Sequence, residues 1–130
     1  MNHRDSLRRK TVVIADDNVI VRHCWKQALH DWKTERYGTP EAFFTAAVHN
    51  LDLDGQYACF IIDLHYGIGH MDGVAFAQRL RPRFRGPIFL SSDEKLAALP
   101  ETIQAQIPKD TMTSDELHKL IQKYCLGEPP

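Results

Sequence analysis

The sequence predicts an α/β fold in which a parallel sheet is covered by helices on both faces. Short apolar segments of the kind that forms buried strands alternate with segments whose apolar residues recur at helical spacing. This alternation favours right-handed crossover connections between parallel strands. The 130-residue chain is 43% hydrophobic and 25% charged, which suits one globular domain.

The first part of the chain predicts a strand, a helix and a second strand. Residues 11–15 form a continuously apolar segment, typical of a strand that is buried on both faces. Asn18 is placed to cap a helix whose apolar residues recur at helical spacing. These residues are Val21, Cys24, Trp25, Ala28, Leu29 and Trp32. The polar segment 33–38 is a weaker strand candidate that suits an edge of the sheet.

A second helix and a central strand follow. Thr39 as the N-cap and Pro40 at the first helical position predict a helix that runs to about residue 51. Residues 52–56 are predicted to form a turn, and the apolar run 57–62 a buried central strand.

The second half of the chain completes the pattern. A glycine-rich loop at residues 64–70 leads to a predicted helix at 74–81, and the run 88–90 predicts a fourth strand. The last helix is predicted from the capping box of Thr113 with Glu116. Its apolar face consists of Leu117, Leu120, Ile121 and Tyr124.

The bulk composition excludes several function classes. The 16 basic and 17 acidic side chains give no net field to attract nucleic acid or an anionic membrane. No apolar segment approaches the roughly 20 residues needed to span a bilayer. Three widely spaced cysteines predict reduced, mostly buried thiols in a cytoplasmic protein. We expect a basic N-terminal tail at residues 1–10, one domain at 11–126 and a C-terminal tail at 127–130.

Acidic residues end two of the predicted strands. Asp16 and Asp17 follow the first apolar run, and Asp63 ends the central one. The C-terminal ends of neighbouring parallel strands converge in the crevice where such folds bind ligands. Clustered carboxylates repel one another unless a cation lies among them, and oxygen ligands suit Mg²⁺. One of the three carboxylates is then a candidate nucleophile toward a phosphoryl group.

The order of these motifs resembles a response-regulator receiver domain, the phosphoacceptor module of two-component signalling. The motifs are TVVIADDN, CFIIDLHYG, MDG and PIFLSS, followed by Lys109, and the resemblance covers about residues 11–125. It implies a flavodoxin-like, doubly wound five-stranded parallel sheet in the order 2-1-3-4-5, with helices on both faces.

The resemblance also implies roles for individual residues. Asp63 would accept a phosphoryl group from the phosphohistidine of a histidine kinase or a histidine phosphotransfer domain. Asp17 would bind Mg²⁺ directly and Asp16 through a water, while Asp63 and the backbone carbonyl of His65 supply further oxygen ligands. Lys109 would contact the phosphoryl oxygens and stabilise their charge.

A serine at the end of the fourth strand resembles the family's switch hydroxyl, which hydrogen-bonds a phosphoryl oxygen and biases a two-state loop. Counting from Pro87 selects Ser92, whereas counting from the end of the apolar run selects Ser91. We favour Ser91.

The chain departs from the family in several places. The loop between Asp63 and Asp72 is longer than usual, and Lys109 is preceded rather than followed by proline. The segment between the serines and Lys109 is shorter, so the fourth helix is expected to be brief, at about residues 93–99, before Pro100. Gln106 stands where an aromatic switch residue is common.

The sequence therefore favours a phosphorylation-controlled signalling switch whose chemistry is limited to its own phosphorylation and dephosphorylation. Its partners would be a kinase or phosphotransfer domain and a downstream effector or fused output domain, with no direct nucleic-acid or membrane contact. One alternative is a pseudo-receiver that signals without phosphate. A less favoured alternative is a Mg²⁺-dependent aspartyl phosphohydrolase, in which His65 stands where a second aspartate usually serves as general acid.

Overall fold

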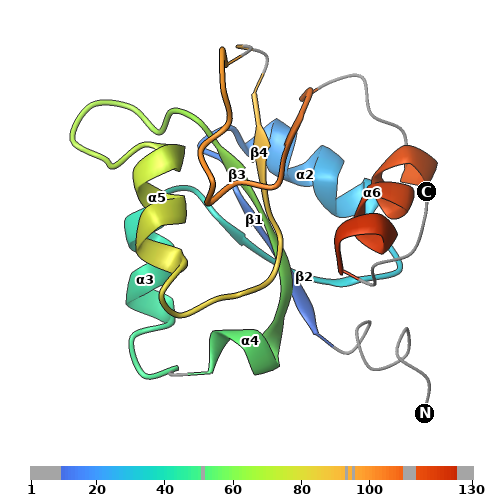
Figure 1. Ribbon diagram of the computed structural model, residues 1–130, viewed down its shortest axis with the longest axis horizontal. Helices are drawn as coiled ribbons and strands as arrows, with labels where there is room; N and C mark the ends of the chain where they lie inside the picture. Colours follow the sequence, from blue (N-terminus) through green and yellow to red (C-terminus); the bar gives the residue numbers. More distant parts are fainter. Residues whose placement is uncertain (1–9, 51, 93, 95, 110–113, 126–130) are drawn as a thin grey trace.

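The protein folds around one five-stranded, all-parallel sheet in the order β2-β1-β3-β4-β5 (Figure 1). The structure, a computed structural model, describes residues 10–50, 52–92, 94, 96–109 and 114–125. The strands are β1 (Thr11–Ala15), β2 (Lys33–Tyr37), β3 (Tyr57–Asp63), β4 (Ile88–Ser91) and β5 (Ala105–Ile107). The predicted fold class and strand order are confirmed.

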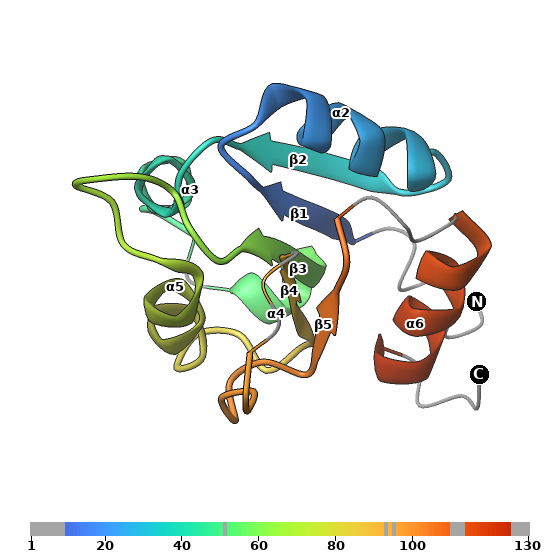
Figure 2. The same cartoon turned by 90° about the horizontal axis from the view of Figure 1, so that it is seen from above.

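Helices cover both faces of this sheet (Figure 2). On one face lie α2 (Val19–Ala28) and α6 (Ser114–Cys125), and on the other lie α3 (Pro40–Ala46) and α5 (Gly73–Leu80). Successive strand residues point to opposite faces. Every residue of β1 and β3 is therefore buried, which explains why their sequences are apolar without alternation. In contrast, β2 at the edge is polar and only partly buried.

Local capping signals set the starts of the helices as predicted. Asn18 Oδ1 accepts hydrogen bonds from the N–H groups of Ile20 and Val21 at 2.9 and 3.3 Å. Thr39 Oγ1 accepts one from Ala42 N–H at 3.1 Å. Satisfying the first free N–H groups of a helix in this way fixes its start.

Two features near the end of α3 differ from the prediction. This helix ends at Ala46 instead of near residue 51, and the predicted turn at 52–56 contains a one-turn helix, α4 (Leu53–Gln56). The side chains of Asn50 and Asp52 cause the difference, because they accept hydrogen bonds from Asp52 N–H and Gly55 N–H. Such local side-chain bonds compete with continuation of a helix.

The predicted helix at residues 93–99 is wrong for the residues that the structure describes there. Glu94 and residues 96–99 form bends and irregular backbone. The carboxamide of Gln106 on β5 supplies the reason. Its Nε2 donates to the backbone carbonyls of Ser92 and Glu94, and its Oε1 accepts from Leu96 N–H at 3.4 Å. These are backbone groups that a first helical turn would otherwise use.

Some predictions concern residues that the structure does not describe, and the predicted burial of most cysteines was wrong. Thr113, the whole predicted C-terminal tail and all of the predicted N-terminal tail except Lys10 lie outside the described residues. Cys59 is buried, but Cys24 is exposed and Cys125 is half-buried, so burial of most thiols was wrong; all three are free. Within the described ranges, no helix has the length and apolar character required to cross a bilayer.

Candidate functional site

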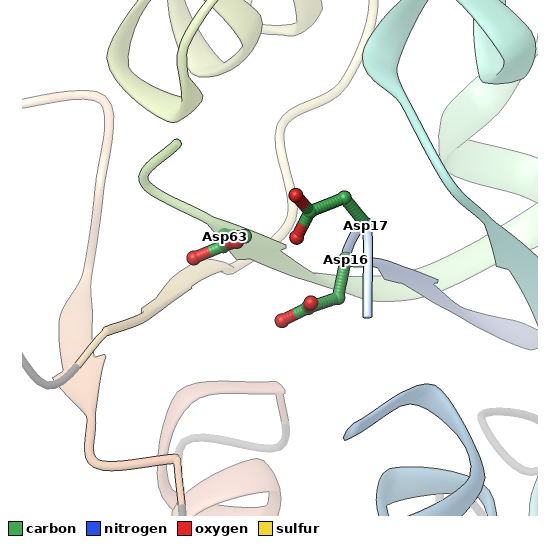
Figure 3. A group of neighbouring side chains, drawn as sticks. All are labelled: Asp16, Asp17 and Asp63. Atoms are coloured by element: carbon green, nitrogen blue, oxygen red, sulfur yellow. The ribbon is translucent and has the colours of Figure 1, made fainter. Parts of the chain in front are cut away.

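Three carboxylates gather at the C-terminal ends of β1 and β3 (Figure 3). Asp63 is the last residue of β3, and Asp16 and Asp17 follow β1 directly. Asp16 and Asp63 are only 1% and 5% exposed, whereas Asp17 is exposed. One oxygen from each carboxylate lies within 4.8 Å of the other two. The structure thus brings together the three aspartates that the sequence singled out.

Lys109, which follows β5, bridges the two buried carboxylates. Its Nζ lies 3.0 Å from Asp63 Oδ1 and 3.1 Å from Asp16 Oδ2, and its side chain is 19% exposed. Burial by itself lowers the pKa of Lys109. Its hydrogen bonds and charge interactions with Asp63 and Asp16 outweigh burial, so the net pKa is raised above the ordinary value. The lysine is therefore a fixed cation in the site.

The pKa of Asp16 shows that its ionised form is disfavoured in this arrangement. Burial is the largest cause that raises the pKa of its carboxyl above the ordinary value, and the negative charge of Asp63 adds to it. The N–H of Asn18, which donates to Asp16 Oδ1 at 2.9 Å, and the nearby Lys109 oppose this increase. A second positive charge at the cluster would relieve the remaining repulsion.

The two serines at the end of β4 have different hydrogen-bond environments: Ser91 is the last residue of the strand, and Ser92 follows it. Ser91 is the register partner of Asp63 in the β3–β4 pair, so the two side chains share a face of the sheet. Its hydroxyl is buried and has no hydrogen-bond partner among the described residues. The hydroxyl of Ser92 accepts a hydrogen bond from Glu94 N–H at 3.0 Å. Of the two serines, Ser91 is thus the one whose hydroxyl can form a new hydrogen bond to a group bound at Asp63.

The glycine-bearing loop after β3 is attached to both flanks of the site. On one side, His65 Nε2 lies 3.0 Å from Glu94 Oε2. On the other, His70 Nδ1 lies 2.9 Å from Glu41 Oε1 at the start of α3. Gly67 and Gly69 adopt φ values of 93° and 88°, in the left-handed region that favours glycine.

The donor set fits a hard divalent cation. Three carboxylates with oxygens this close are the ligands that Mg²⁺ prefers, and the exposed position of Asp17 leaves room for the waters that the ion retains. The role of the His65 carbonyl as a further ligand stays a prediction. The side chains of His65 and His70 point to other partners, namely Glu94 and Glu41.

The sequence reasoning missed one residue of the site, Tyr66. Its hydroxyl accepts a hydrogen bond from Asp63 N–H at 2.8 Å and donates one to the carbonyl of Ala15 at 2.7 Å. The available signal was an aromatic residue within a loop that is rich in glycine and histidine. Such a side chain gains stability only by burial, and burial of a tyrosine hydroxyl requires partners.

Comparison with known proteins supports the fold. No protein-family model matches the sequence. No curated protein matches it either. Many solved structures match the structure of this chain, and among them are numerous receiver domains of response regulators.

Three of these structures illustrate the likeness. The chemotaxis protein CheY4 of Vibrio cholerae has a TM-score of 0.71 at 16% identity, covering 88% of this chain and 98% of the other. The Thermotoga maritima response regulator TrrA, solved with Mg²⁺ and BeF, has a TM-score of 0.69 at 17% identity, covering 88% and 97%. A Saccharomyces cerevisiae complex of the phosphotransfer protein Ypd1 with the receiver domain of Ssk1 gives 0.70 at 13% identity, covering 92% and 90%. At such identities, the likeness establishes that this chain has the receiver-domain fold.

Proposed function

We propose that this protein is a phosphoacceptor receiver domain that accepts a phosphoryl group on Asp63 and changes conformation in response. The observation that carries the proposal is the bridge formed by Lys109 between Asp63 and Asp16, within a cluster of three carboxylates. A surface lysine or a lone strand-end aspartate has other common explanations. A half-buried lysine that joins two buried carboxylates at the ligand-binding edge of a parallel sheet favours a site that binds or transfers a charged group.

The proposed step is the transfer of a phosphoryl group from a phosphohistidine. A carboxylate oxygen of Asp63 attacks phosphorus, the P–N bond to the histidine breaks, and an acyl phosphate forms. Leu64 N–H donates to Asp63 Oδ1 at 2.8 Å, and Lys109 contacts the same oxygen. Both contacts hold the carboxylate in place, and we therefore assign the attack to Oδ2. Lys109 then stabilises negative charge on the transferred group.

Asp16, Asp17 and Asp63, with the backbone carbonyl of His65, would hold Mg²⁺ in this site. The bound cation would supply positive charge against which both the carboxylates and the phosphoryl oxygens are stabilised. The buried pair of Asp16 and Asp63 depends on such compensation, because Lys109 alone offers one charge to two carboxylates.

Ser91 is the proposed switch hydroxyl. Its buried oxygen, which has no hydrogen-bond partner in the part of the chain that the structure describes, would gain a hydrogen bond to a phosphoryl oxygen. A hydrogen bond to a charged group contributes about 1.5–3 kcal/mol. This amount is sufficient to shift a two-state loop about tenfold or more. Ser92 remains the alternative, although its hydroxyl already bonds Glu94 N–H.

The partners follow from the same proposal. A histidine kinase or histidine phosphotransfer domain would donate the phosphoryl group, and a downstream effector or a fused output domain would read the response. The yeast complex of a receiver domain with a phosphotransfer protein supports the first of these partners. We further propose a cytoplasmic location, which suits the three free thiols.

One observation favours a second candidate, a pseudo-receiver that signals without phosphate. The described residues between β4 and β5 form no helix, and the side chain of Gln106 on β5 bonds the backbone of Ser92 and Glu94. An aspartyl phosphohydrolase is less favoured, because the His65 side chain is exposed and pairs with Glu94.

Labelling with a small phosphodonor separates these candidates. Acetyl phosphate with Mg²⁺ should phosphorylate the wild type, as read by intact-protein mass spectrometry, and Asp63→Asn should block it because an amide is a poor nucleophile. Asp72→Asn is the matched control: Asp72 caps α5 by accepting from Ala75 N–H at 2.8 Å and lies outside the cluster. Full labelling of Asp63→Asn would move the acceptor elsewhere. A wild type that neither takes label nor binds beryllofluoride would favour the pseudo-receiver.

A further inference from the structure

We propose that Tyr66 is a positioning residue of the phosphoacceptor site, whose hydroxyl ties the ends of β1 and β3 together and sets the spacing of Asp16 and Asp63. The proposal rests on the function proposed above for that site. Pairing of β1 with β3 stops just before Asp16 and Asp63, so the strand hydrogen bonds alone do not fix the spacing of these two residues.

The contacts of the hydroxyl are specific. It accepts from the backbone N–H of Asp63, the acceptor residue itself, and donates to the carbonyl of Ala15, the residue before Asp16. Paired residues of β1 and β3 end at Ala15 and Ile62. The phenol oxygen therefore cross-links the two strands where their pairing stops and where the carboxylates begin.

The rest of the side chain holds this hydroxyl in place. Tyr66 is 4% exposed and belongs to the core cluster on the α3 and α5 face, where its ring packs edge-on against Phe76 at 6.4 Å between centroids. A phenol hydroxyl has one proton to donate, and here that proton bonds the Ala15 carbonyl.

The cluster needs such a brace. Asp16 and Asp63 carry like charges within 4.8 Å of each other and repel. Asp63 is held by Leu64 N–H at its carboxylate, but that bond lies within the same loop and does not fix the distance to β1. The Tyr66 hydroxyl joins the backbones of the two strand ends, whereas Lys109 bridges only the carboxylates of Asp16 and Asp63. Loss of the Tyr66 hydroxyl would let the strand ends shift relative to each other, and small misplacements of reacting groups are costly.

A pair of tyrosine-to-phenylalanine variants tests the proposal. Tyr66→Phe removes only the bridging hydroxyl. Tyr57→Phe is the matched control, because Tyr57 is also 4% exposed and its hydroxyl makes two contacts, with Glu35 and Gln56, both at 3.2 Å. It lies at the other end of β3, away from the carboxylates. Both variants lose a buried hydroxyl, so thermal stability should fall in both.

The rate of phosphorylation and the Mg²⁺ affinity should distinguish the two variants. For Tyr66→Phe we expect a roughly tenfold to hundredfold slower reaction with acetyl phosphate, the range that small misplacement produces. Its Mg²⁺ affinity, followed by the amide shifts of Asp16, Asp17 and Asp63, should weaken as well. Tyr57→Phe should react and bind like the wild type. Incorporation of 3-fluorotyrosine at position 66 keeps the hydroxyl and should preserve wild-type behaviour.

Several outcomes would overturn the proposal. One is a Tyr66→Phe variant that reacts and binds Mg²⁺ like the wild type, and another is a Tyr57→Phe variant that is impaired equally. A wild type that takes no label contradicts the proposed function instead, and the Mg²⁺ affinities of the two variants still decide the role of Tyr66. If Tyr66→Phe does not fold, Mg²⁺ titration of the wild type is the test. The Tyr66 ring signals should then move together with the Asp16 and Asp63 amides, and ring signals that do not respond would contradict the proposal.

Discussion

The two halves of the sheet's C-terminal edge are built differently. At β1 and β3, side chains and backbone hold the carboxylates directly: Asn18 N–H bonds Asp16, Leu64 N–H bonds Asp63, and Tyr66 joins the two strands. At β4 and β5, the described residues form no helix between the strands, and the side chain of Gln106 holds the backbone of that segment.

This difference separates the reacting groups from the segment that would report the reaction. Of the proposed reacting and metal-binding side chains, only Lys109 comes from the β5 side, and it reaches the carboxylates across the edge of the sheet. The segment after β4 depends on a carboxamide with three backbone contacts instead of on helical hydrogen bonds. Substitutions in the two regions should therefore affect different measurements.

The largest effect is expected for Lys109→Met, which removes the ion pairs from the β5 side to the carboxylates of Asp16 and Asp63. Breaking a buried ion pair from one side leaves uncompensated charge and costs about 3 kcal/mol or more of unfolding free energy. Chemical denaturation near neutral pH should show this loss, and added Mg²⁺ should recover part of it. Lys123→Met is the control, because Lys123 lies on the exposed side of α6 over the Tyr124 ring. An unchanged free energy in Lys109→Met would mean that the bridge adds no stability.

Ser91→Ala should separate reaction from response. Labelling by acetyl phosphate should remain largely intact, while the response of residues 92 and 96–99 to phosphorylation, read by amide hydrogen exchange, should be blunted. The term removed is one hydrogen bond to a charged group, about 1.5–3 kcal/mol. Ser92→Ala removes only the bond to Glu94 N–H and should respond more like the wild type. The reverse pattern would assign the switch to Ser92.

Gln106→Leu should leave the reaction unchanged and loosen the segment that Gln106 holds. Loss of a few neutral hydrogen bonds costs about 0.5–1.5 kcal/mol each, so the fold should persist. Amide exchange of Leu96, whose N–H bonds Gln106 Oε1, should accelerate in the unphosphorylated variant. Gln122→Leu on α6 serves as the control. Slower labelling in Gln106→Leu would show that the two regions are coupled more tightly than their contacts indicate.

The smallest expected effect concerns Glu41 and is pH-dependent. The hydrogen bond from Met71 N–H is the largest cause that lowers the pKa of Glu41 below its ordinary value of 4.5, with His70 adding to it. Because the folded-state pKa is lowered, ionised Glu41 stabilises the fold above pH 4.5, and this contribution disappears as the pH falls through the folded value. The Glu41 side chain is 42% exposed, so solvent screens its interactions and Glu41→Gln should cost only roughly a few tenths of a kcal/mol at neutral pH. The difference from the wild type should vanish in acid, and a difference that grows in acid would contradict this account.

What the sequence could predict depended on local signals and on topology. Asn18 and Thr39 predict helix starts because their side chains can cap the first free N–H groups. Asp16 and Asp63 could be predicted to lie close together because both come at the C-terminal ends of neighbouring parallel strands. The helix expected at residues 93–99 failed because Gln106, distant in sequence, takes over its backbone groups. Tyr66 was missed for the same reason: its partners become visible only when the loop folds back between two strand ends. The roles assigned to the site residues stay predictions.

The two outer strands restrict how another chain can attach. A strand at the edge of a sheet carries unpaired backbone groups that invite a further strand. Here one edge, β2, presents Lys33, Glu35 and Arg36, and the other, β5, is only three residues long. Charges and short length both discourage such addition. A partner is therefore expected to recognise this protein through the side chains of its helices and loops, and the sheet should resist extension into larger assemblies.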